Sequence, residues 1–287
     1  MRIEARGKIN LTLSVTGRRP DGYHDLELIF QPVSLSDTLF IDKKPDPGLA
    51  FSCSVKHFET PENLVCRAYQ RLTQRYPGMG GLRVHLEKRI PSGAGMGGGS
   101  ADAAALILGA DLIFGLGMTW EEKTSVGVSL GADVPACMLR GASLGRGIGE
   151  ELTPIDTDLS YPLLIIKPRF SFSTVRMYRA IDEAPALAQQ YSSEEVRKGL
   201  ETGDLLRVCG GLYNVFEEVV PRPDDIRNLK DLLIEHGAMG SLMTGSGSCV
   251  YGIFADTASR DRAYSELRPR YRVYACRAVN EHGGGRG

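Results

Sequence analysis

The sequence predicts an α+β fold with strands and helices in separate layers. Segments in which every second residue is apolar, typical of half-buried strands, are mixed with segments whose apolar residues recur at helical spacing. The mixture lacks the regular strand–helix–strand spacing of a doubly wound sheet. With 287 residues, the chain exceeds the usual size of one hydrophobic core, so two domains or one large unit are expected.

The first 90 residues are rich in strand patterns. Apolar residues at odd positions over 9–15 predict a strand that ends in the turn-rich stretch 18–22, and a second strand is expected over 26–33. Thr60-Pro61 marks the start of a helix, because proline is favoured in the first helical turn. Alternation over 82–86 predicts another half-buried strand.

The most informative stretch is the glycine-rich loop 91–102, which follows that strand and precedes an apolar helix over 103–114. Five glycines in so short a loop cost backbone entropy, so a function that needs bare amides close to a ligand is expected. The amino end of a helix offers unpaired amides and partial positive charge, and Ser100 is placed to cap it. The loop therefore predicts a polyphosphate site.

Two familiar phosphate loops fit this stretch poorly. A Walker A loop ends in Gly-Lys-Ser/Thr, but no lysine occurs between Lys88 and Lys123. The pattern G-x-G-x-x-G of dinucleotide-binding proteins is met over 93–98. However, the preceding strand is amphipathic and no strand-terminal acid follows at the required distance.

Downstream, helices and strands continue to alternate irregularly. A capping box of Thr119 and Glu122 begins a helix that stops near Gly131. The stretch 143–161 lacks a helix pattern, so the domain boundary is placed near its end, which gives domains 1–158 and 159–287. The expected C-terminal elements are strands at 163–167, near 242, 250–254 and 272–278, and helices at 193–208, 213–219, 224–236 and 259–267. The tail 282–287 is expected to be disordered.

Composition and charge exclude several classes of protein. The 42% hydrophobic and 24% charged residues are typical of an ordinary globule, and the net charge of −1 leaves no electrostatic footprint for nucleic acid or an anionic membrane. No stretch is long enough to span a bilayer. Six cysteines lie without C-x-x-C spacing and the first residues lack a signal-peptide core, so reduced thiols in the cytoplasm are expected.

Four clusters of residues occur in an order and spacing that identify a family. They are Lys8-Ile9-Asn10-Leu11 with Asp21-Gly22-Tyr23-His24, the glycine-rich loop, Gly131-Ala132-Asp133-Val134-Pro135, and Met243-Thr244-Gly245-Ser246-Gly247-Ser248. With these motifs the chain resembles the GHMP small-molecule kinases over 8–278. The resemblance implies a two-lobed α+β fold: an N-terminal ATP-binding domain over 1–158, like a domain of ribosomal protein S5, a C-terminal α/β-sandwich domain over 159–287, and the active site between them.

Two motifs, Asp21-Gly22-Tyr23-His24 and Gly147-Ile148-Gly149-Glu150, point to one branch of that family. Resemblance to this branch implies an ATP-dependent kinase that phosphorylates the 2-hydroxyl of 4-diphosphocytidyl-2-C-methyl-D-erythritol in the non-mevalonate route to isoprenoid precursors. It implies ATP as co-substrate and Mg²⁺ held mainly by phosphates, without a protein metal site. A monomer or weak homodimer with no nucleic-acid or membrane partner is expected. Val215 stands where the family often has an aspartate.

The resemblance also implies a reacting centre. Phosphoryl transfer needs positioning, neutralisation of phosphate charge and a base for the attacking hydroxyl. Asp133 is the candidate base, because Gly131 and Pro135 would take the backbone out of a helix and hold the side chain on a short turn. A helix cap or Asx turn is the alternative. The resemblance pairs Asp133 with Lys8, which would keep the aspartate ionised.

ATP binding is assigned by the resemblance to eleven consecutive residues of the glycine-rich loop: Pro91, Ser92, Gly93, Ala94, Gly95, Met96, Gly97, Gly98, Gly99, Ser100 and Ala101. In the C-terminal half, Gly245 and Ser246 belong to a second glycine-rich loop that would approach the phosphates and the substrate. A plain hairpin is the alternative there.

The remaining substrate contacts are expected near the first strand. Asn10 shares a strand face with Lys8, and two polar groups on one face of a buried strand indicate a ligand contact. The resemblance places Tyr23 and His24 at the cytidine end, where an aromatic ring can stack and an imidazole can hydrogen-bond. Thr174 and Tyr178 match the far side of the same pocket, with a helix cap and a packing aromatic as the alternative.

Two other functions stay open at this point. A related GHMP kinase that acts on homoserine or mevalonate would lack the Tyr23-His24 pair. A nucleotide-sensing or RNA-binding module is a second alternative, because the expected N-terminal fold resembles a domain of a ribosomal protein. The net charge of −1 and the presence of both Lys8 and Asp133 argue against such a module.

Overall fold

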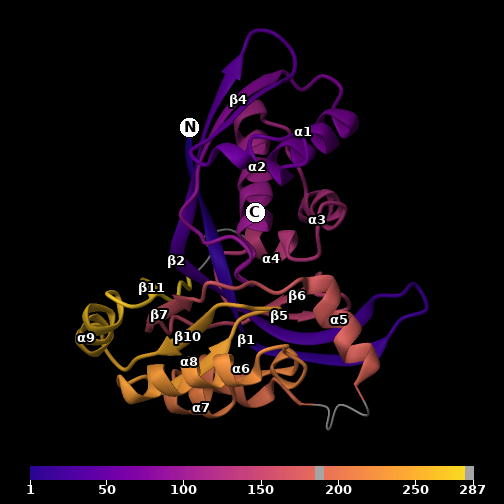
Figure 1. Ribbon diagram of the computed structural model, residues 1–287. Coiled ribbons are helices and arrows are strands. Elements are labelled where there is room, and N and C mark those ends of the chain that lie inside the picture. The colour runs from indigo at the N-terminus through magenta and orange to yellow at the C-terminus, as the bar shows by residue number, and fades with distance from the viewer. Residues whose placement is uncertain (185–190, 282–287) are drawn as a thin grey trace. The chain divides into compact units, whose positions relative to one another are not determined.

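The computed structural model describes residues 1–184 and 191–281, and it divides into two compact units. Unit 1 comprises residues 1–7, 36–90 and 97–139, and unit 2 comprises residues 8–35, 91–96 and 140 onward. Two long strands, β1 (Arg2–Arg18) and β2 (His24–Lys44), contribute to both units (Figure 1). Each unit is built from several separate segments of the chain, so the units do not correspond to one boundary in sequence. The domain boundary at 158 stays a prediction. The expected disordered tail lies outside the described residues.

Unit 1 is a sheet covered by helices. β3 (Leu49–Cys53) pairs in parallel with β4 (Gly81–Glu87), which pairs antiparallel with residues 38–44 of β2. Inward-facing residues of β4 pack with α2 in one hydrophobic core, which fixes where the glycine-rich loop ends. The helical segments of unit 1 are η1 (Lys56–Phe58), α1 (Leu64–Arg75), α2 (Gly98–Phe114), α3 (Trp120–Val128) and α4 (Val134–Met138).

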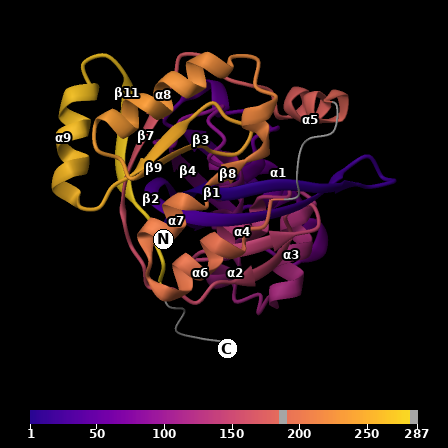
Figure 2. The ribbon, with the colours of Figure 1, turned by 90° about the horizontal axis from the view of Figure 1, so that it is seen from below.

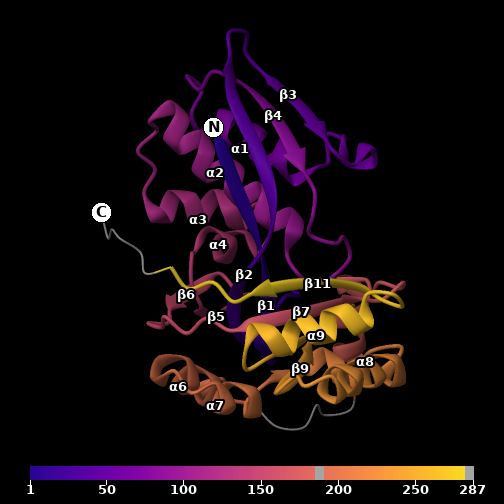
Figure 3. The ribbon, with the colours of Figure 1, turned by 90° about the vertical axis from the view of Figure 1, so that its left-hand side faces the viewer.

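Unit 2 contains a four-stranded antiparallel sheet in the order β11-β7-β10-β9. Figure 3 shows two helices alongside it: α8 packs against β9 and β10, and α9 packs against β7 and β11. The sheet strands and these helices are β7 (Pro162–Lys167), α8 (Pro223–Glu235), β9 (Gly240–Met243), β10 (Val250–Ile253), α9 (Thr257–Leu267) and β11 (Arg272–Arg277).

The rest of unit 2 surrounds the hairpin formed by β1 and β2. Residues 28–30 of β2 pair with β5, and Thr12 of β1 lies opposite Tyr213 of β8. Figure 2 shows the hairpin reaching out beside α5. The elements here are β5 (Ser143–Arg146), β6 (Glu151–Pro154), α5 (Thr174–Glu183), α6 (Glu194–Thr202), α7 (Leu205–Gly210), β8 (Tyr213–Asn214) and η2 (Val215–Glu218).

Most of the expected elements are confirmed, and the capping box is present: Glu122 N donates to Thr119 Oγ1 at 3.2 Å and Thr119 N donates to Glu122 Oε2 at 3.0 Å. The helix expected from Thr60 instead begins at Leu64, because Asn63 caps it by accepting a 2.9 Å hydrogen bond from Val65 N. Such a cap is a competing start signal that lies close by in sequence.

Two expected helices in unit 2 are wrong. The helix over 193–208 is divided into α6 and α7, because Gly203 takes a left-handed φ of 71° and ends α6. The helix over 213–219 is a two-residue strand followed by a 3-10 turn, in which Asn214 Oδ1 accepts a 3.0 Å hydrogen bond from Phe216 N. The short elements β3, α4 and α5 were not expected, since each offers too few apolar repeats for a periodic signal.

Candidate functional site

The amino end of α2 has the properties of a phosphate site. The helix begins at Gly98, its N-cap residue is Gly97 with a φ of 64°, and no side chain caps it. The expectation that Ser100 caps the helix is wrong, because the left-handed turn at Gly97 starts the helix before the serine, which lies in the first turn. The first amides of α2 therefore lack helical partners and, with the helix dipole, favour an anion. This end of α2 is therefore suited to an anionic group such as a phosphate.

The first half of the loop, Pro91 to Met96, is packed against the hairpin that joins β9 and β10 in unit 2. Thr244 Oγ1 donates to Gly95 O at 3.2 Å, and Cys249 N donates to Ala94 O at 3.2 Å. Gly95 has a φ of 73°, and a Cβ atom there would lie 2.0 Å from Thr244 O. Gly95 is therefore required for close packing within unit 2. The sequence pattern alone had indicated only a ligand as the reason for the glycines.

Within unit 1, three buried charged groups join the two ends of the loop. Lys88 Nζ donates to a carboxylate oxygen of Asp37 and, at 2.7 Å, to Asp102 Oδ2 in the second turn of α2. Asp37 also accepts hydrogen bonds from the amides of Arg89 and Ile90, just before the loop. Lys88, Asp37 and Asp102 are 10%, 0% and 4% exposed. Sequence reasoning missed this triad, since nothing local relates residue 37 to residues 88 and 102.

The protonation of the triad reflects its burial. Burial raises the pKa of Asp102 well above its usual range, although the Lys88 ammonium group acts in the opposite direction. Burial alone would lower the pKa of Lys88, but the carboxylates of Asp102 and Asp37 raise it overall. Asp102 Oδ1 is buried and has no hydrogen-bond partner in the part of the chain that the structure describes. Lys88 is thus the cation that makes two buried carboxylates tolerable at the base of the loop.

Asp133 lies at the start of α4 in unit 1. Asp133 lies, as expected, in a short turn, over residues 132–133 before the helix, with φ −77° and ψ −13°. The expectation that Pro135 takes the backbone out of a helix is wrong, because this proline occupies the first turn of α4, where it is tolerated. The side chain of Asp133 is half-buried and does not cap α4, which argues against the helix-cap alternative. A Cβ atom on Gly131 would lie 3.9 Å from Ser100 Oγ, so the turn before α4 lies beside the first turn of α2.

Lys8 and Asn10 lie together in unit 2, on one face of β1 as expected. Lys8 Nζ donates to Asn10 Oδ1 at 2.8 Å, and the two residues are 5% and 0% exposed. Asn10 N donates to Thr244 Oγ1 at 3.1 Å. Asn10 Nδ2 is buried without a hydrogen-bond partner among the described residues. An orphaned buried donor beside a buried ammonium group is a feature of a ligand site rather than of a core.

His24 is another buried polar residue of the hairpin. Its ring is 7% exposed, stacks on Tyr178 of α5 with a centroid separation of 5.0 Å, and has Nε2 2.9 Å from Asp182 Oδ1. Tyr178 also packs edge-on against Phe216. Tyr23, in contrast, is 60% exposed at the tip of the hairpin. Unit 2 therefore brings His24 and Tyr178 together, with the Tyr23 ring in solvent.

The second glycine-rich loop contacts α5. Thr174 is the first residue of α5, after its N-cap Ser173, and its hydroxyl lies 2.8 Å from Ser246 Oγ. The loop is held from behind by Asn214, whose Nδ2 donates to Met243 O at 2.7 Å and to Gly245 O at 2.9 Å. Asn214 is a positioning residue that sequence reasoning missed, because its segment was expected to be helical.

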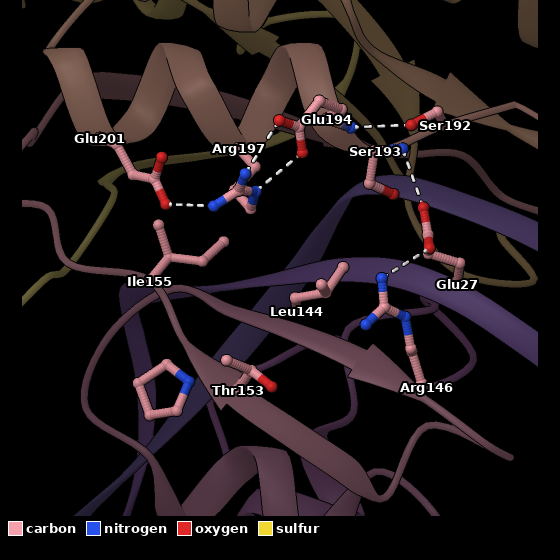
Figure 4. A pocket seen from close by; sticks show the side chains of 11 residues that line it. Glu27, Leu144, Arg146, Thr153, Ile155, Ser192, Ser193, Glu194, Arg197 and Glu201 are labelled. Carbon is pink, nitrogen blue, oxygen red and sulfur yellow. Dashed lines mark hydrogen bonds and ion pairs between the residues drawn. The ribbon is translucent and has the colours of Figure 1, made fainter.

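A small cavity of about 300 Å³ is lined by Glu27 of β2, close to the tip of the hairpin (Figure 4). Glu27, three residues after His24, accepts hydrogen bonds from Ser193 N at 3.0 Å and from Arg146 at 3.2 Å. On the opposite wall, Arg197 bridges Glu194 and Glu201. All five charged side chains of this cavity are paired. The contacts of Glu27 join β2 to β5 and to the start of α6.

The expected site residues are therefore distributed over both units. Unit 1 contains Gly97 to Ala101 and Asp133, and unit 2 contains Lys8, Asn10, His24, Pro91 to Met96, Thr174, Tyr178, Gly245 and Ser246, together with the exposed Tyr23. Among the described residues, no group of three or more His, Cys, Asp or Glu side chains is arranged to hold a metal ion. The helices of residues 1–184 and 191–281 are all too short or too polar to cross a bilayer.

Comparisons with known proteins agree with these features. The model of the GHMP kinases N terminal domain matches residues 63–141, and that of the GHMP kinases C terminal domain matches residues 194–273. A crystal structure of 4-(cytidine 5'-diphospho)-2C-methyl-D-erythritol kinase superposes with a TM-score of 0.85 at 32% identity, covering 98% of this chain and 100% of that one. A mevalonate kinase from L. major shares the fold at 18% identity, with a TM-score of 0.77 and 99% and 97% coverage.

Two curated relatives cover nearly the whole chain. The 4-diphosphocytidyl-2-C-methyl-D-erythritol kinase of Alkaliphilus metalliredigens is 37% identical over 95% of this chain and 94% of its own length. The kinase of the same name from Moorella thermoacetica is 39% identical over 94% of this chain and 95% of its own. Both lobes of the expected fold are matched in order. The chain belongs to the GHMP kinases, in the family of the 4-diphosphocytidyl-2-C-methyl-D-erythritol kinases, and is an ATP-dependent kinase.

Proposed function

We propose that this kinase transfers the γ-phosphoryl group of ATP to the 2-hydroxyl of 4-diphosphocytidyl-2-C-methyl-D-erythritol, the compound in the name of its relatives. The observation that carries the proposal is the fixed imidazole of His24, stacked on Tyr178 and bonded to Asp182. A buried ring held on two sides in this way is suited to reading a base, and we assign it to the cytosine.

The hydrogen bond to Asp182 supports cytosine over uracil. In a neutral His24 ring, donation from Nε2 to the Asp182 carboxylate leaves Nδ1 as an acceptor. The exocyclic amino group of cytosine is a donor, whereas uracil presents an acceptor at the same position. We assign Tyr23 to stacking on the base, with its exposed ring closing over the ligand.

The triphosphate of ATP is assigned to the loop from Pro91 to Ala101. The uncapped amino end of α2 supplies amides and a positive dipole for the phosphate oxygens. Mg²⁺, when bound, neutralises phosphate charge, and we expect phosphates, water and the Ser100 hydroxyl to hold it. Gly245 and Ser246, placed by Asn214, are assigned to the substrate beside Thr174.

We assign the chemistry to two charged residues. Asp133 accepts the proton of the attacking hydroxyl, and Lys8 offsets the charge that develops on the transferred group. We assign the catalytic effect of Asp133 to alignment of its carboxylate with the attacking hydroxyl. Asn10 Nδ2, which has no partner among the described residues, is assigned to a substrate hydroxyl, while Asn10 Oδ1 accepts from Lys8 Nζ at 2.8 Å.

The test of this function is a coupled assay of ADP release. Purified protein is supplied with Mg-ATP and, in separate reactions, with 4-diphosphocytidyl-2-C-methyl-D-erythritol, homoserine and mevalonate. We expect turnover with the cytidylated substrate alone, and phosphorus NMR of the product should show one new phosphomonoester. Faster turnover with homoserine or mevalonate would reassign the enzyme to another branch of the GHMP kinases. We further propose a cytoplasmic monomer or weak homodimer, which light scattering at assay concentrations would check.

A further inference from the structure

Unit 2 contains a larger cavity to which nothing above assigns a role. It measures about 860 Å³ and lies between the turn after β7, one face of α8 and the start of β11. Four of its lining side chains are cationic, Lys167, Arg169, Arg270 and Arg272, and one is acidic, Asp225. Arginine stays charged at any accessible pH, so this wall carries a permanent excess of positive charge.

The excess is not balanced by ion pairs. Asp225 is already paired with Arg222 at 3.1 Å. Within residues 1–184 and 191–281, none of the four cations has a carboxylate oxygen within 4.0 Å. Lys167 Nζ instead donates to neutral oxygens, among them Pro168 O at 2.9 Å and Phe170 O at 2.7 Å. The paired charges of the cavity in Figure 4 show that the same unit balances its charges elsewhere.

The strand register brings two of the cations into direct opposition. Arg272 of β11 is paired with Lys167 of β7 in an antiparallel ladder. Like charges directly opposite each other destabilise a sheet. Burial, and in addition the Arg272 guanidinium, lower the pKa of Lys167. The fold therefore accepts an electrostatic cost at this cavity, which an anionic ligand would relieve.

The other walls of the cavity are apolar or aromatic. Leu229 and Leu232 of α8 form one side, and Tyr271, which lies between Arg270 and Arg272 in sequence, adds a partly exposed ring. Guanidinium groups bind phosphate oxygens through paired hydrogen bonds. We propose that this cavity binds the diphosphate group of a small molecule, with Arg270 and Arg272 on the phosphate oxygens and Leu229, Leu232 and Tyr271 against the attached organic part.

An occupant would also touch the glycine-rich loop. Ser92 of that loop lines the cavity, and so does Ser171, whose hydroxyl lies 2.7 Å from where a Cβ atom on Gly93 would be. The diphosphate could be that of ATP itself or that of a separate metabolite. Both share the chemistry that the arginines recognise, and the binding proposal depends on neither the acceptor substrate nor turnover.

The test uses inorganic pyrophosphate as the probe and the full chain. Calorimetric titration at fixed ionic strength compares the wild type with Arg270→Ala/Arg272→Ala and with a control, Arg262→Ala/Arg268→Ala. The control removes the same charge from α9 and its C-cap in the same unit, outside the cavity. We expect the Kd to rise about tenfold or more in the cavity variant and to stay unchanged in the control. Equal affinity of the two double variants, or no binding to the wild type, would overturn the proposal.

Repeating the titration with a saturating non-hydrolysable ATP analogue distinguishes the two sources. If pyrophosphate still binds and the cavity variant still weakens it, the ligand is a separate diphosphate. If the analogue displaces pyrophosphate and itself binds the cavity variant more weakly, the site receives the phosphates of ATP. Either result supports the site.

Melting temperatures test the role of Arg272 independently of the calorimetric Kd. Arg272→Ala alone removes the charge opposite Lys167, so its melting temperature without ligand should equal or exceed that of the wild type. Pyrophosphate should raise the melting temperature of the wild type more than that of Arg272→Ala. An equal rise in both proteins would contradict the role given to Arg272.

Discussion

Lys88 Nζ lies 2.7 Å from Asp102 Oδ2, and this contact links the strand that enters the glycine-rich loop to the helix that leaves it. Asp37 completes the link, because it accepts hydrogen bonds from both the Lys88 ammonium group and the amide of Ile90. The loop's two ends in unit 1 are thus fixed by buried charges rather than by the loop's own sequence. A phosphate loop gains from such preorganisation, because its amides must be in place before the ligand arrives.

We therefore expect Lys88→Met to damage both stability and nucleotide use. Removing one partner of a buried ion pair costs about 3–5 kcal/mol, because it leaves the other charges buried and uncompensated. The KM for ATP should rise roughly tenfold to a hundredfold as the loop loses its position, and Lys88→Arg should restore part of it. Chemical denaturation and initial rates at varied ATP would measure both effects.

A matched control exists at the other end of α2. Lys123 pairs with Asp111 at 2.7 Å and is also partly buried. Lys123→Met should lower stability while leaving the KM for ATP as in the wild type. If both variants changed this KM in proportion to their loss of stability, Lys88 would be structural only.

Asp102 makes the stability of the enzyme depend on pH. Its pKa in the folded chain is raised by burial, so between the unfolded pKa near about 4 and the higher folded value the native state binds more protons than the unfolded state. Stability from this group is present at the acid end of that window and is lost as pH rises through the folded pKa. The stability of the wild type relative to Asp102→Asn should therefore decrease from pH 5 to pH 8 in urea titrations, and a constant difference would contradict the raised pKa.

The glycines of the loop give a test of packing against ligand binding. Gly95→Ala should destabilise the protein even without ATP, because its Cβ atom would lie 2.0 Å from Thr244 O and its φ is 73°. Gly99 lies in α2, and among the described residues a Cβ atom there would meet Leu64 Cδ1 at 3.4 Å. The free energy of unfolding of Gly99→Ala should therefore equal that of the wild type or exceed it by up to about 1 kcal/mol. Thermal melts without nucleotide would show the contrast. Equal melting temperatures would mean that the contact at Gly95 relaxes freely.

Local sequence signals predicted the parts of the site that are local in structure. The period of two along β1 placed Lys8 and Asn10 on one face, and their side chains are 2.8 Å apart. The glycine run before an apolar segment predicted a helix whose amino end faces a ligand, and α2 begins at Gly98. Both inferences depend on neighbours within a few residues, where backbone geometry alone decides the outcome.

The parts that sequence could not supply depend on long-range contacts. Asp37 is 51 residues from Lys88 in sequence, and no pattern relates them before the sheet forms. Ser100 was expected to cap α2 because serine is a good cap, but the left-handed turn at Gly97 begins the helix earlier. Likewise, Asn214 holds Gly245 only because a short strand forms where helical propensity suggested a helix.

Asp133→Ala tests the proposed base. Its carboxylate does not cap α4, and a thermal melt of the variant checks that the fold is retained. A positioned base contributes about 10² to 10⁴ in rate, and kcat should fall within that range while the Kd for ATP stays near the wild-type value. Rapid-quench turnover and equilibrium nucleotide binding would separate the two quantities. Retention of more than about a tenth of kcat would remove Asp133 from the role of base.

The last prediction concerns the base of the substrate. Tyr23→Ala should lose stacking of roughly 1–3 kcal/mol, which is about 5-fold to 150-fold in kcat/KM for the cytidylated substrate. Asp182→Ala should act differently: His24 Nε2 loses its acceptor, so the ring is free to present a donor where it presented an acceptor. Discrimination against the uridine analogue should therefore fall in Asp182→Ala and persist in Tyr23→Ala.

A matched control is Asp25→Ala, since Asp25 lies on the same hairpin but pairs with Arg19 instead of His24. Measurement of kcat/KM for the cytidine and uridine substrates in all three variants would decide, and an unchanged cytidine-to-uridine ratio in Asp182→Ala would refute the assignment of His24 to the cytosine edge.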